Sequence, residues 1–203
     1  MGDSVTLTET LTFCLIAYLL GSLSSAIIVS KIFGLTDPRK VGSGNPGATN
    51  VLRYAGKKIA ALTLAGDAFK GIAPIKISFF FGVSQEVGAI VGCFAFLGHL
   101  FPIFHSFKGG KGVATFLGVT SALYWQIGAC FLMSWIFIAL VTRYSSLSAL
   151  LSSLIVVALI WEFSQSANMV SCFALMAAFI YVKHNKNIVN LFQGKEKKIG
   201  DDS

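Results

Sequence analysis

The stretch VATFLGVTSALYWQIGACFLMSWIFIALV, residues 113–141, decides how this chain folds. It carries no charged side chain. It is too long for one membrane-spanning helix, which needs roughly 20 apolar residues, and barely long enough for two. The whole chain has this character: of 203 residues, 55% are hydrophobic and 12% charged, and the mean hydropathy is +0.74. Because a soluble domain carries about 25% charged residues, this composition indicates an integral membrane protein. It excludes a soluble enzyme, a coiled coil and a disordered chain.

Five other apolar segments are candidate spans, at about 11–33, 59–83, 87–107, 147–161 and 168–182. The basic residues decide how often 113–141 crosses the membrane. Nearly all of the 16 Lys and Arg lie in four segments, at 31–58, 108–111, 143 and 183–198. Cytoplasmic loops carry an excess of Lys and Arg. The four segments share one face only if 113–141 crosses twice, turning near Trp125 and Gln126.

We therefore expect an all-α integral membrane protein with seven transmembrane helices, two of them short, in one membrane-embedded domain over 1–203. The first span follows Glu9 and precedes Lys31 and Arg39, which is the reverse of a secretory signal peptide. This order places the N-terminus outside and the C-terminus in the cytoplasm. The net charge of +7 is then a topology signal, and we expect no nucleic-acid partner. The four cysteines lie in apolar runs without ligand spacing, so we expect no metal site.

The first cytoplasmic loop reads GSGNPGATN, residues 42–50. Its glycines permit positive φ and can expose successive N–H groups, as loops that cradle phosphate do. A turn-rich connector whose Asn and Ser side chains satisfy their own backbone is the alternative. The density of donors between two arginines favours a phosphate site. Its candidate ligands are Arg39, Gly42, Ser43, Gly44, Asn45, Gly47, Thr49, Asn50 and Arg53.

The second cytoplasmic loop contains FKGGKGVAT, residues 107–115. Lys108 and Lys111 are separated by Gly109 and Gly110 and stand just before a predicted helix, an arrangement that favours binding of a dianion. Alternatively, the lysines serve only to keep the loop cytoplasmic. His99, inside an apolar stretch, is interpreted as a hydrogen-bonded packing residue.

Two further patterns contain polar residues inside or near the spans. His184 and Asn187 would share a face if the last helix continues past Tyr181; a solvated helix end is the alternative. Asp67 and Lys70 lie within the second span, and their spacing predicts a mutual ion pair with a structural role.

Taken in order, these motifs closely resemble the bacterial acyl-phosphate:glycerol-3-phosphate acyltransferases over about residues 18–196. The matching stretches are GS at 21–22, DxR at 37–39, GSGNxGATN at 42–50, DxxKG at 67–71, GHxFP at 98–102, FKGGKGVAT at 107–115 and HxxNI at 184–188. The chain departs from the family pattern at Asn190, often basic, and at Ser24, where a proline is common.

The resemblance implies a seven-span enzyme of the bacterial cytoplasmic (inner) membrane, with its active site facing the cytoplasm. It would transfer a fatty acyl group from acyl phosphate to the 1-hydroxyl of glycerol 3-phosphate, forming lysophosphatidic acid, with membrane lipid as its surroundings and no cofactor. It further implies that Ser43, Arg53, Lys111, His184 and Asn187 contact the substrates. Lys111, His184 and Asn187 are the expected catalytic residues.

The sequence lacks a His with an Asp five positions on, and it lacks a GxSxG elbow. We therefore hypothesise direct transfer without an acyl-enzyme, with Lys111, Arg53 and the amides of 42–47 neutralising phosphate. The proton acceptor is either a substrate phosphate oxygen or His184. A transporter or phosphate-binding protein is the competing class. Polar residues outside the cytoplasmic motifs are few, which favours an interfacial enzyme.

Overall fold

The computed structural model describes residues 6–201; residues 1–5 and 202–203 lie outside the described part. The secondary structure of the described chain is entirely helical, and its two long connections are residues 33–47 and 101–112. Its elements are α1 (Leu7–Gly21), α2 (Ser25–Ile32), α3 (Ala48–Phe80), α4 (Gln85–Leu100), the 3-10 turn η1 (Ile103–His105), α5 (Val113–Leu123), α6 (Trp125–Thr142), α7 (Ser145–Ser164), α8 (Ala167–Lys183) and α9 (Asn185–Phe192).

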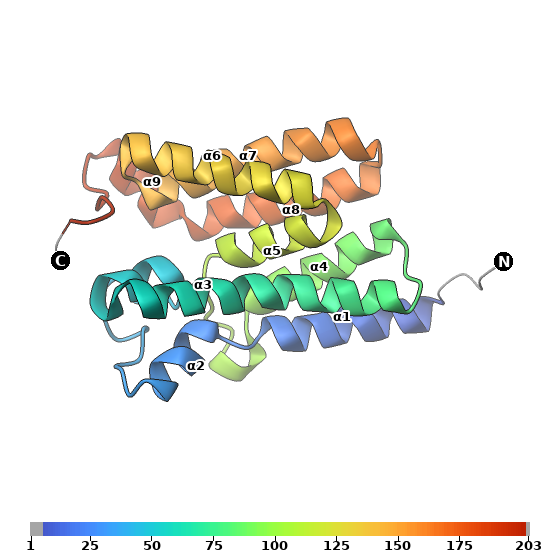
Figure 1. Cartoon of the computed structure of the whole chain (residues 1–203), viewed down its shortest axis with the longest axis horizontal. Coiled ribbons are helices and arrows are strands. Elements are labelled where there is room, and N and C mark those ends of the chain that lie inside the picture. Colours follow the sequence, from blue (N-terminus) through green and yellow to red (C-terminus); the bar gives the residue numbers. More distant parts are fainter. Residues whose placement is uncertain (1–5, 202–203) are drawn as a thin grey trace.

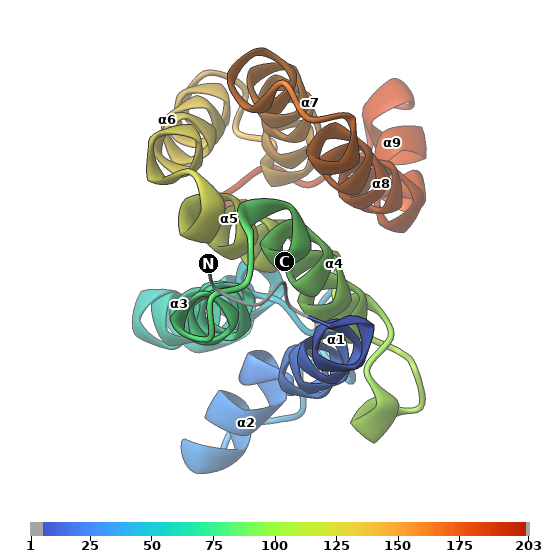
Figure 2. The same cartoon turned by 90° about the vertical axis from the view of Figure 1, so that its right-hand side faces the viewer.

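The long helices lie roughly along one axis, and the chain reverses direction at each connection between them (Figure 1). Viewed along that axis, α1 to α4 form one side of the bundle, α6 to α9 form the other, and α5 lies between (Figure 2). The main apolar core crosses this centre, where the Phe116 ring lies 6.5 Å from Phe96, 5.6 Å from Phe131 and 5.7 Å from Phe173. The connections that carry Lys or Arg, 33–47, 101–112 and 143–144, and the segment after α9 lie toward the same end of the bundle (Figure 1).

The stretch 113–141 forms two helices, as the charge pattern predicts, and the break falls at Tyr124. Only α5 is short: its 11 residues span about 16 Å at the usual 1.5 Å rise, half of a bilayer core. Its neighbours shelter it, because α3 approaches so closely that a Cβ on Gly118 would lie 2.1 Å from the Ala68 carbonyl oxygen. By contrast α6, with 18 residues, is a full-length candidate span.

The first predicted span, 11–33, is wrong as a single helix. It is two helices bent by 43°, with the break at Ser22–Ser24. The Ser22 hydroxyl donates to the Tyr18 carbonyl at 2.8 Å, and Lys70 Nζ donates to the Leu23 carbonyl at 2.7 Å. The Tyr18 carbonyl also keeps its helical bond from the Ser22 amide at 2.9 Å, so it is the Lys70 bond that satisfies a backbone oxygen, that of Leu23, which a continuous helix would have paired internally. Ser24 is the N-cap of α2.

Two more helices are interrupted. The last span continues past Tyr181 as far as Lys183 and then breaks at His184, where α8 and α9 meet at 61°. Within α3, Gly56 leaves the helical region at φ 80° and ψ 179°, so the segment before it is a separate helical piece. Within residues 6–201, three helices are long and apolar enough to cross a membrane alone, or up to five if each bent pair counts as one span.

Candidate active site

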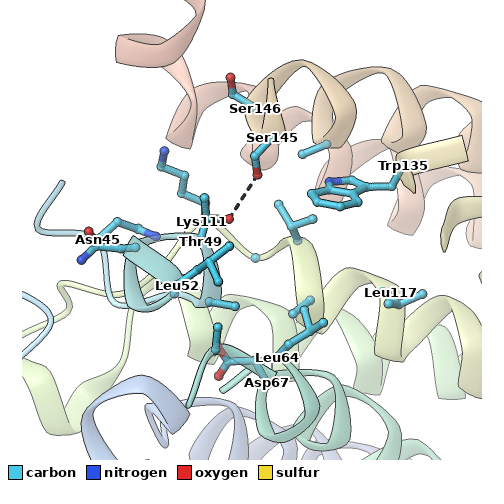
Figure 3. A pocket seen from close by; sticks show the side chains of 18 of the residues that line it. Asn45, Thr49, Leu52, Leu64, Asp67, Lys111, Leu117, Trp135, Ser145 and Ser146 are labelled. Carbon is cyan, nitrogen blue, oxygen red and sulfur yellow. Dashed lines mark hydrogen bonds between the residues drawn. The ribbon is translucent and has the colours of Figure 1, made fainter. Parts of the chain in front are cut away.

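A cavity of about 430 Å³ lies between the start of α3, the loop before α5, the helix α6, the start of α7 and the α8–α9 junction. In Figure 3, Lys111, Asn45, Thr49 and Ser145 lie toward one side of the cavity, Trp135 toward the other, and Asp67 below. The cavity therefore has a polar end made by the loops and an apolar end made by the helices.

The glycine-rich loop is shaped by Asn50, whose side chain is buried. Its Oδ1 accepts from the Ser43 amide at 2.9 Å, and its Nδ2 donates to the carbonyls of Pro38 and Val41 at 2.9 and 3.1 Å. Gly42, at φ 58°, comes so close to Asn50 Oδ1 that an added Cβ would lie 2.3 Å away. Asn50 lines the cavity, but its hydrogen-bonding atoms are used to fold the loop.

The polar end is completed on this side by Ser43, Asn45, Thr49 and Arg53, which all line the cavity. No side chain caps the start of α3 at Gly47. The first amide groups of a helix have no partner within it and attract anions. The start of α3 therefore presents backbone donors beside the Arg53 guanidinium, a combination suited to phosphate.

The opposite side of the polar end is a chain of hydrogen bonds. Lys111 Nζ donates to Asn187 Oδ1 at 2.5 Å, and Asn187 Nδ2 donates to Glu196 Oε1 at 2.7 Å. The Ser146 hydroxyl donates to the same carboxylate oxygen at 2.6 Å. Glu196, which follows α9, thus fixes the orientation of Asn187, and Asn187 in turn fixes Lys111. We call Arg53 and Lys111, with the donors around them, the cationic end.

Burial lowers the pKa of Lys111, Glu196 opposes this effect, and Arg53 adds to it. The pKa of His184 falls to about 4, first because it is buried and second because Lys111 is close. His184 is therefore neutral near pH 7. Its Nδ1 lies 2.8 Å from the Ile180 carbonyl oxygen, which can only accept, so Nδ1 carries the proton. Nε2 is then left as an acceptor for a hydroxyl group.

Several predicted phosphate ligands do not line this cavity. Arg39 is held by Asp37 at 2.6 Å and is exposed, and Lys108 is exposed as well. Gly109 and Gly110 pack against His99: an added Cβ would lie 2.0 Å from the His99 carbonyl oxygen and 2.3 Å from its Nε2, respectively. Of the ligands predicted in the second loop, only Lys111 lines the cavity, next to Gly112. Gly42 and Gly44 act through the loop's shape rather than by lining the cavity.

Three residues that the sequence does not single out, Ser145, Ser146 and Glu196, line the cavity. Thr49 and Ser145 are joined by a 3.1 Å hydrogen bond between their hydroxyl groups, which links the starts of α3 and α7. No pattern in the sequence marks these residues, because they reach the site through the fold of segments far apart in the chain.

Below the cavity lies a buried cluster of Asp67, Lys70 and His99, which we call the floor cluster. Lys70 Nζ is 3.0 Å from Asp67 Oδ1, and His99 Nδ1 is 3.7 Å from the same oxygen. The predicted ion pair is thus confirmed. It has His99 as a further neighbour, and Asp67 and His99 both line the cavity.

The apolar end is built by Leu64, Leu117, Leu132, Trp135 and Ile136. Leu64, Leu132 and Ile136 are each 43% exposed and lie on α3 and α6. The cavity thus joins cationic groups at one end to an apolar groove with half-exposed leucine and isoleucine side chains at the other.

A family model described as glycerol-3-phosphate acyltransferase matches residues 11–194. The chain is 48% identical to the glycerol-3-phosphate acyltransferase of Methylococcus capsulatus over 91% of its length and 93% of the relative. It is 45% identical to that of Cupriavidus metallidurans over 94% and 96% of the two chains.

The structure is similar to crystal structures of PlsY, an integral membrane glycerol 3-phosphate acyltransferase. The glycerol 3-phosphate form gives a TM-score of 0.89 at 36% identity, covering 95% of this chain and 96% of the other. The lysophosphatidic acid form gives 0.88 at 35% identity, with the same coverage. The chain therefore belongs to the glycerol-3-phosphate acyltransferase family.

Proposed function

We propose that this protein transfers a fatty acyl group from acyl phosphate to the 1-hydroxyl of glycerol 3-phosphate, forming lysophosphatidic acid and inorganic phosphate. Family membership supports glycerol 3-phosphate as acceptor and lysophosphatidic acid as product. One observation carries the proposal: a single cavity joins a cationic end, with Arg53 and Lys111, to an apolar groove between α3, α5 and α6. Two phosphates and one acyl chain need these surroundings.

In this arrangement the acyl chain lies along Leu64, Leu117 and Leu132, and the phosphates lie at the cationic end. Acyl phosphate is an activated mixed anhydride, so the protein needs chiefly to orient the reactants and stabilise charge. The glycerol oxygen bonds to the acyl carbon, and the bond from that carbon to the phosphate oxygen breaks. Lys111 and Arg53 compensate the negative charge that passes to the leaving phosphate.

The proton of the glycerol hydroxyl goes to a phosphate oxygen or to His184 Nε2. The neutral state of His184 and its free Nε2 support a role in which it accepts a hydrogen bond from the hydroxyl and orients it. A pKa of about 4 makes this imidazole a weak base at neutral pH. We therefore assign the proton to substrate phosphate and orientation to His184.

The proposed enzyme spans the bacterial inner membrane seven times, with the cationic end in the cytoplasm. Alternating helix directions and the basic loops at one end of the bundle support this topology (Figure 1). In a cysteine-free background, single cysteines at Ser43 and Gly194 should label from the cytoplasmic side, and those at Glu86 and Ser164 from outside. Labelling of Ser43 and Gly194 from opposite sides would reject the seven-span arrangement.

The experiment that tests the activity uses purified protein in lipid. It is given acyl phosphate and labelled glycerol 3-phosphate, and labelled lysophosphatidic acid and equimolar inorganic phosphate are measured. Lys111→Met is the matched control, because it removes a charge that lines the cavity and should lower the activity while leaving the protein folded. No lysophosphatidic acid with either substrate saturating would refute the proposed function, and trapping of an acylated serine or cysteine would refute direct transfer.

A further inference from the structure

A second cavity, of about 470 Å³, lies on the outer side of Arg53. One wall comes from α3 around its kink, through Gly56 and Lys57, and the other from the C-terminal segment, through Ile199, Gly200 and Asp201. Most of these residues are exposed, and they lie at the end of the bundle where the basic loops gather (Figure 1). We call this cavity the vestibule; unlike the first cavity, it does not extend into an apolar groove.

The vestibule adjoins the first cavity directly. Thr49, Leu52 and Arg53 line both. An anion bound to Arg53 in the vestibule would thus already contact a residue of the cationic end. When the anion moves from the vestibule into the first cavity, it can stay in contact with Arg53, because the planar guanidinium has N–H donors on several edges.

The outer wall is held in place by Arg143, which follows α6. The Ile199 amide donates to the Arg143 carbonyl at 2.7 Å, and Arg143 Nη2 donates to the Ile199 carbonyl at 3.0 Å. The same guanidinium lies 3.1 Å from Asp201 Oδ1. Among the described lining residues Asp201 is the one carboxylate, and it is compensated by Arg143; of these residues, Arg53 and Lys57 therefore set the sign of the charge.

The size and charge of the vestibule suit a small dianion. Sites for small molecules have volumes of about 300 to 1,000 Å³, and clefts lined by one sign of charge concentrate counter-ions. Among the described lining residues only Leu52 and Ile199 are large and apolar, which is too small an apolar surface to hold an acyl chain.

We propose that the vestibule is a binding site for a phosphate dianion, through Arg53 and Lys57, on the path between water and the cationic end. Glycerol 3-phosphate enters through it and inorganic phosphate leaves through it, while acyl phosphate reaches the cavity from the lipid side. The inference rests on the proposed function, because it assigns separate routes to the substrates of that reaction. Lys57 is the residue that it adds to the binding machinery.

The test compares two adjacent lysines. Lys57 lines the vestibule, whereas Lys58 is exposed and lines neither cavity. In lipid at low ionic strength, Lys57→Met should raise KM for glycerol 3-phosphate about two- to fivefold, the range of an exposed charge pair. The kcat and the KM for acyl phosphate should stay within a factor of about 1.5. Lys58→Met should match the parent, Lys57→Arg should restore the parental KM, and 0.5 M salt should abolish the difference.

Inorganic phosphate as product inhibitor separates the two ligands. If both use the vestibule, the inhibition constant of phosphate rises in Lys57→Met by the same factor as KM. A rise in KM alone would support the route for glycerol 3-phosphate and overturn the one for phosphate. Equal kinetics in Lys57→Met and Lys58→Met, in a protein that makes lysophosphatidic acid, would overturn the inference and leave the proposed function standing. A parent without activity would refute the proposed function itself.

Discussion

The cationic end and the floor cluster both place charges inside a membrane bundle, but they use those charges differently. In the floor cluster, Asp67 and Lys70 lie 3.0 Å apart and Lys70 also bonds the Leu23 carbonyl, so the two charges are paired within the protein, although Asp67 Oδ1 accepts no hydrogen bond among the described residues. At the cationic end, one of the three N–H donors of Lys111 bonds Asn187, and Arg53 lines both cavities. The internally paired charges of the floor cluster stabilise the fold, whereas the remaining N–H donors of Lys111 and Arg53 are suited to binding a ligand.

The largest effect should come from breaking the floor cluster. Asp67→Leu leaves Lys70 buried without its counter-ion, and removing one partner of a buried pair costs about 3–5 kcal/mol. We expect a low yield of folded protein and a much lower thermal unfolding midpoint in detergent. The double variant Asp67→Leu with Lys70→Leu should recover a large part of the loss, because no buried charge remains. A double variant as unstable as the single one would contradict the ion-pair explanation.

The next effect should come from the cationic end and should change activity rather than stability. Lys111→Met removes a charge-assisted contact to phosphate worth about 1.5–3 kcal/mol, which corresponds to roughly 10- to 150-fold in turnover at 1.36 kcal/mol per factor of ten. Protein abundance and the unfolding midpoint should stay close to parental. Lys108→Met should cost less than about twofold, since the structure leaves Lys108 exposed and outside the cavity. Equal losses in the two variants would place Lys111 among the topology-setting lysines.

The sequence predicts the helical membrane fold well and its interruptions poorly. The break at Tyr124 follows from charge distribution, a property of the whole chain. The break at Ser22–Ser24 depends on Lys70, which bonds the Leu23 carbonyl from 47 positions further along. Small polar residues within an apolar run fit a straight helix equally well. Only the tertiary partner decides, and a single sequence does not show it.

The same limit applies to the site. Ser43, Arg53, Lys111, His184 and Asn187 belong to local motifs, and the fold brings all five to one cavity. Arg39 and Lys108 share the composition of those motifs, but Arg39 has Asp37 as its partner and Lys108 lies outside the cavity. Charge and glycine content do not tell which way a side chain faces. Glu196 is found only because the segment after α9 folds back onto Asn187.

A smaller effect should follow from Arg53→Lys, which keeps the charge but loses the planar fork. Losing one net hydrogen bond corresponds to about three- to tenfold in affinity, and we expect it mainly in KM for glycerol 3-phosphate. Steady-state kinetics with acyl phosphate saturating measure this split. A fall in kcat without a change in KM would instead assign Arg53 to the transition state.

The smallest effect should come from His184→Gln, where the side chain amide can still accept and donate hydrogen bonds. If His184 orients the glycerol hydroxyl, the variant should lose about two- to fivefold in kcat, the range of one weakened hydrogen bond. The pH profile of kcat/KM separates this role from that of a base, because it reports groups in the free enzyme and free substrate. In the substrate-free enzyme the pKa of the His184 side chain is about 4, well below its ordinary value, because the ring is buried and lies close to Lys111. The second ionisation of a phosphate monoester lies near pH 6.

The acidic limb near pH 6 should therefore belong to glycerol 3-phosphate and should remain in His184→Gln, while any inflection near pH 4 should vanish. The pH dependence of the free energy of unfolding should also report the lowered pKa of His184. Because the folded state holds His184 neutral, the unfolded chain binds an extra proton between its ordinary pKa near 6.5 and the folded pKa near 4, so parental stability falls as pH drops through that window. The Gln variant should lack that part of the slope. A turnover loss of about a hundredfold or more, the size of general-base removal, together with loss of the limb near pH 6, would show that His184 takes the proton after all.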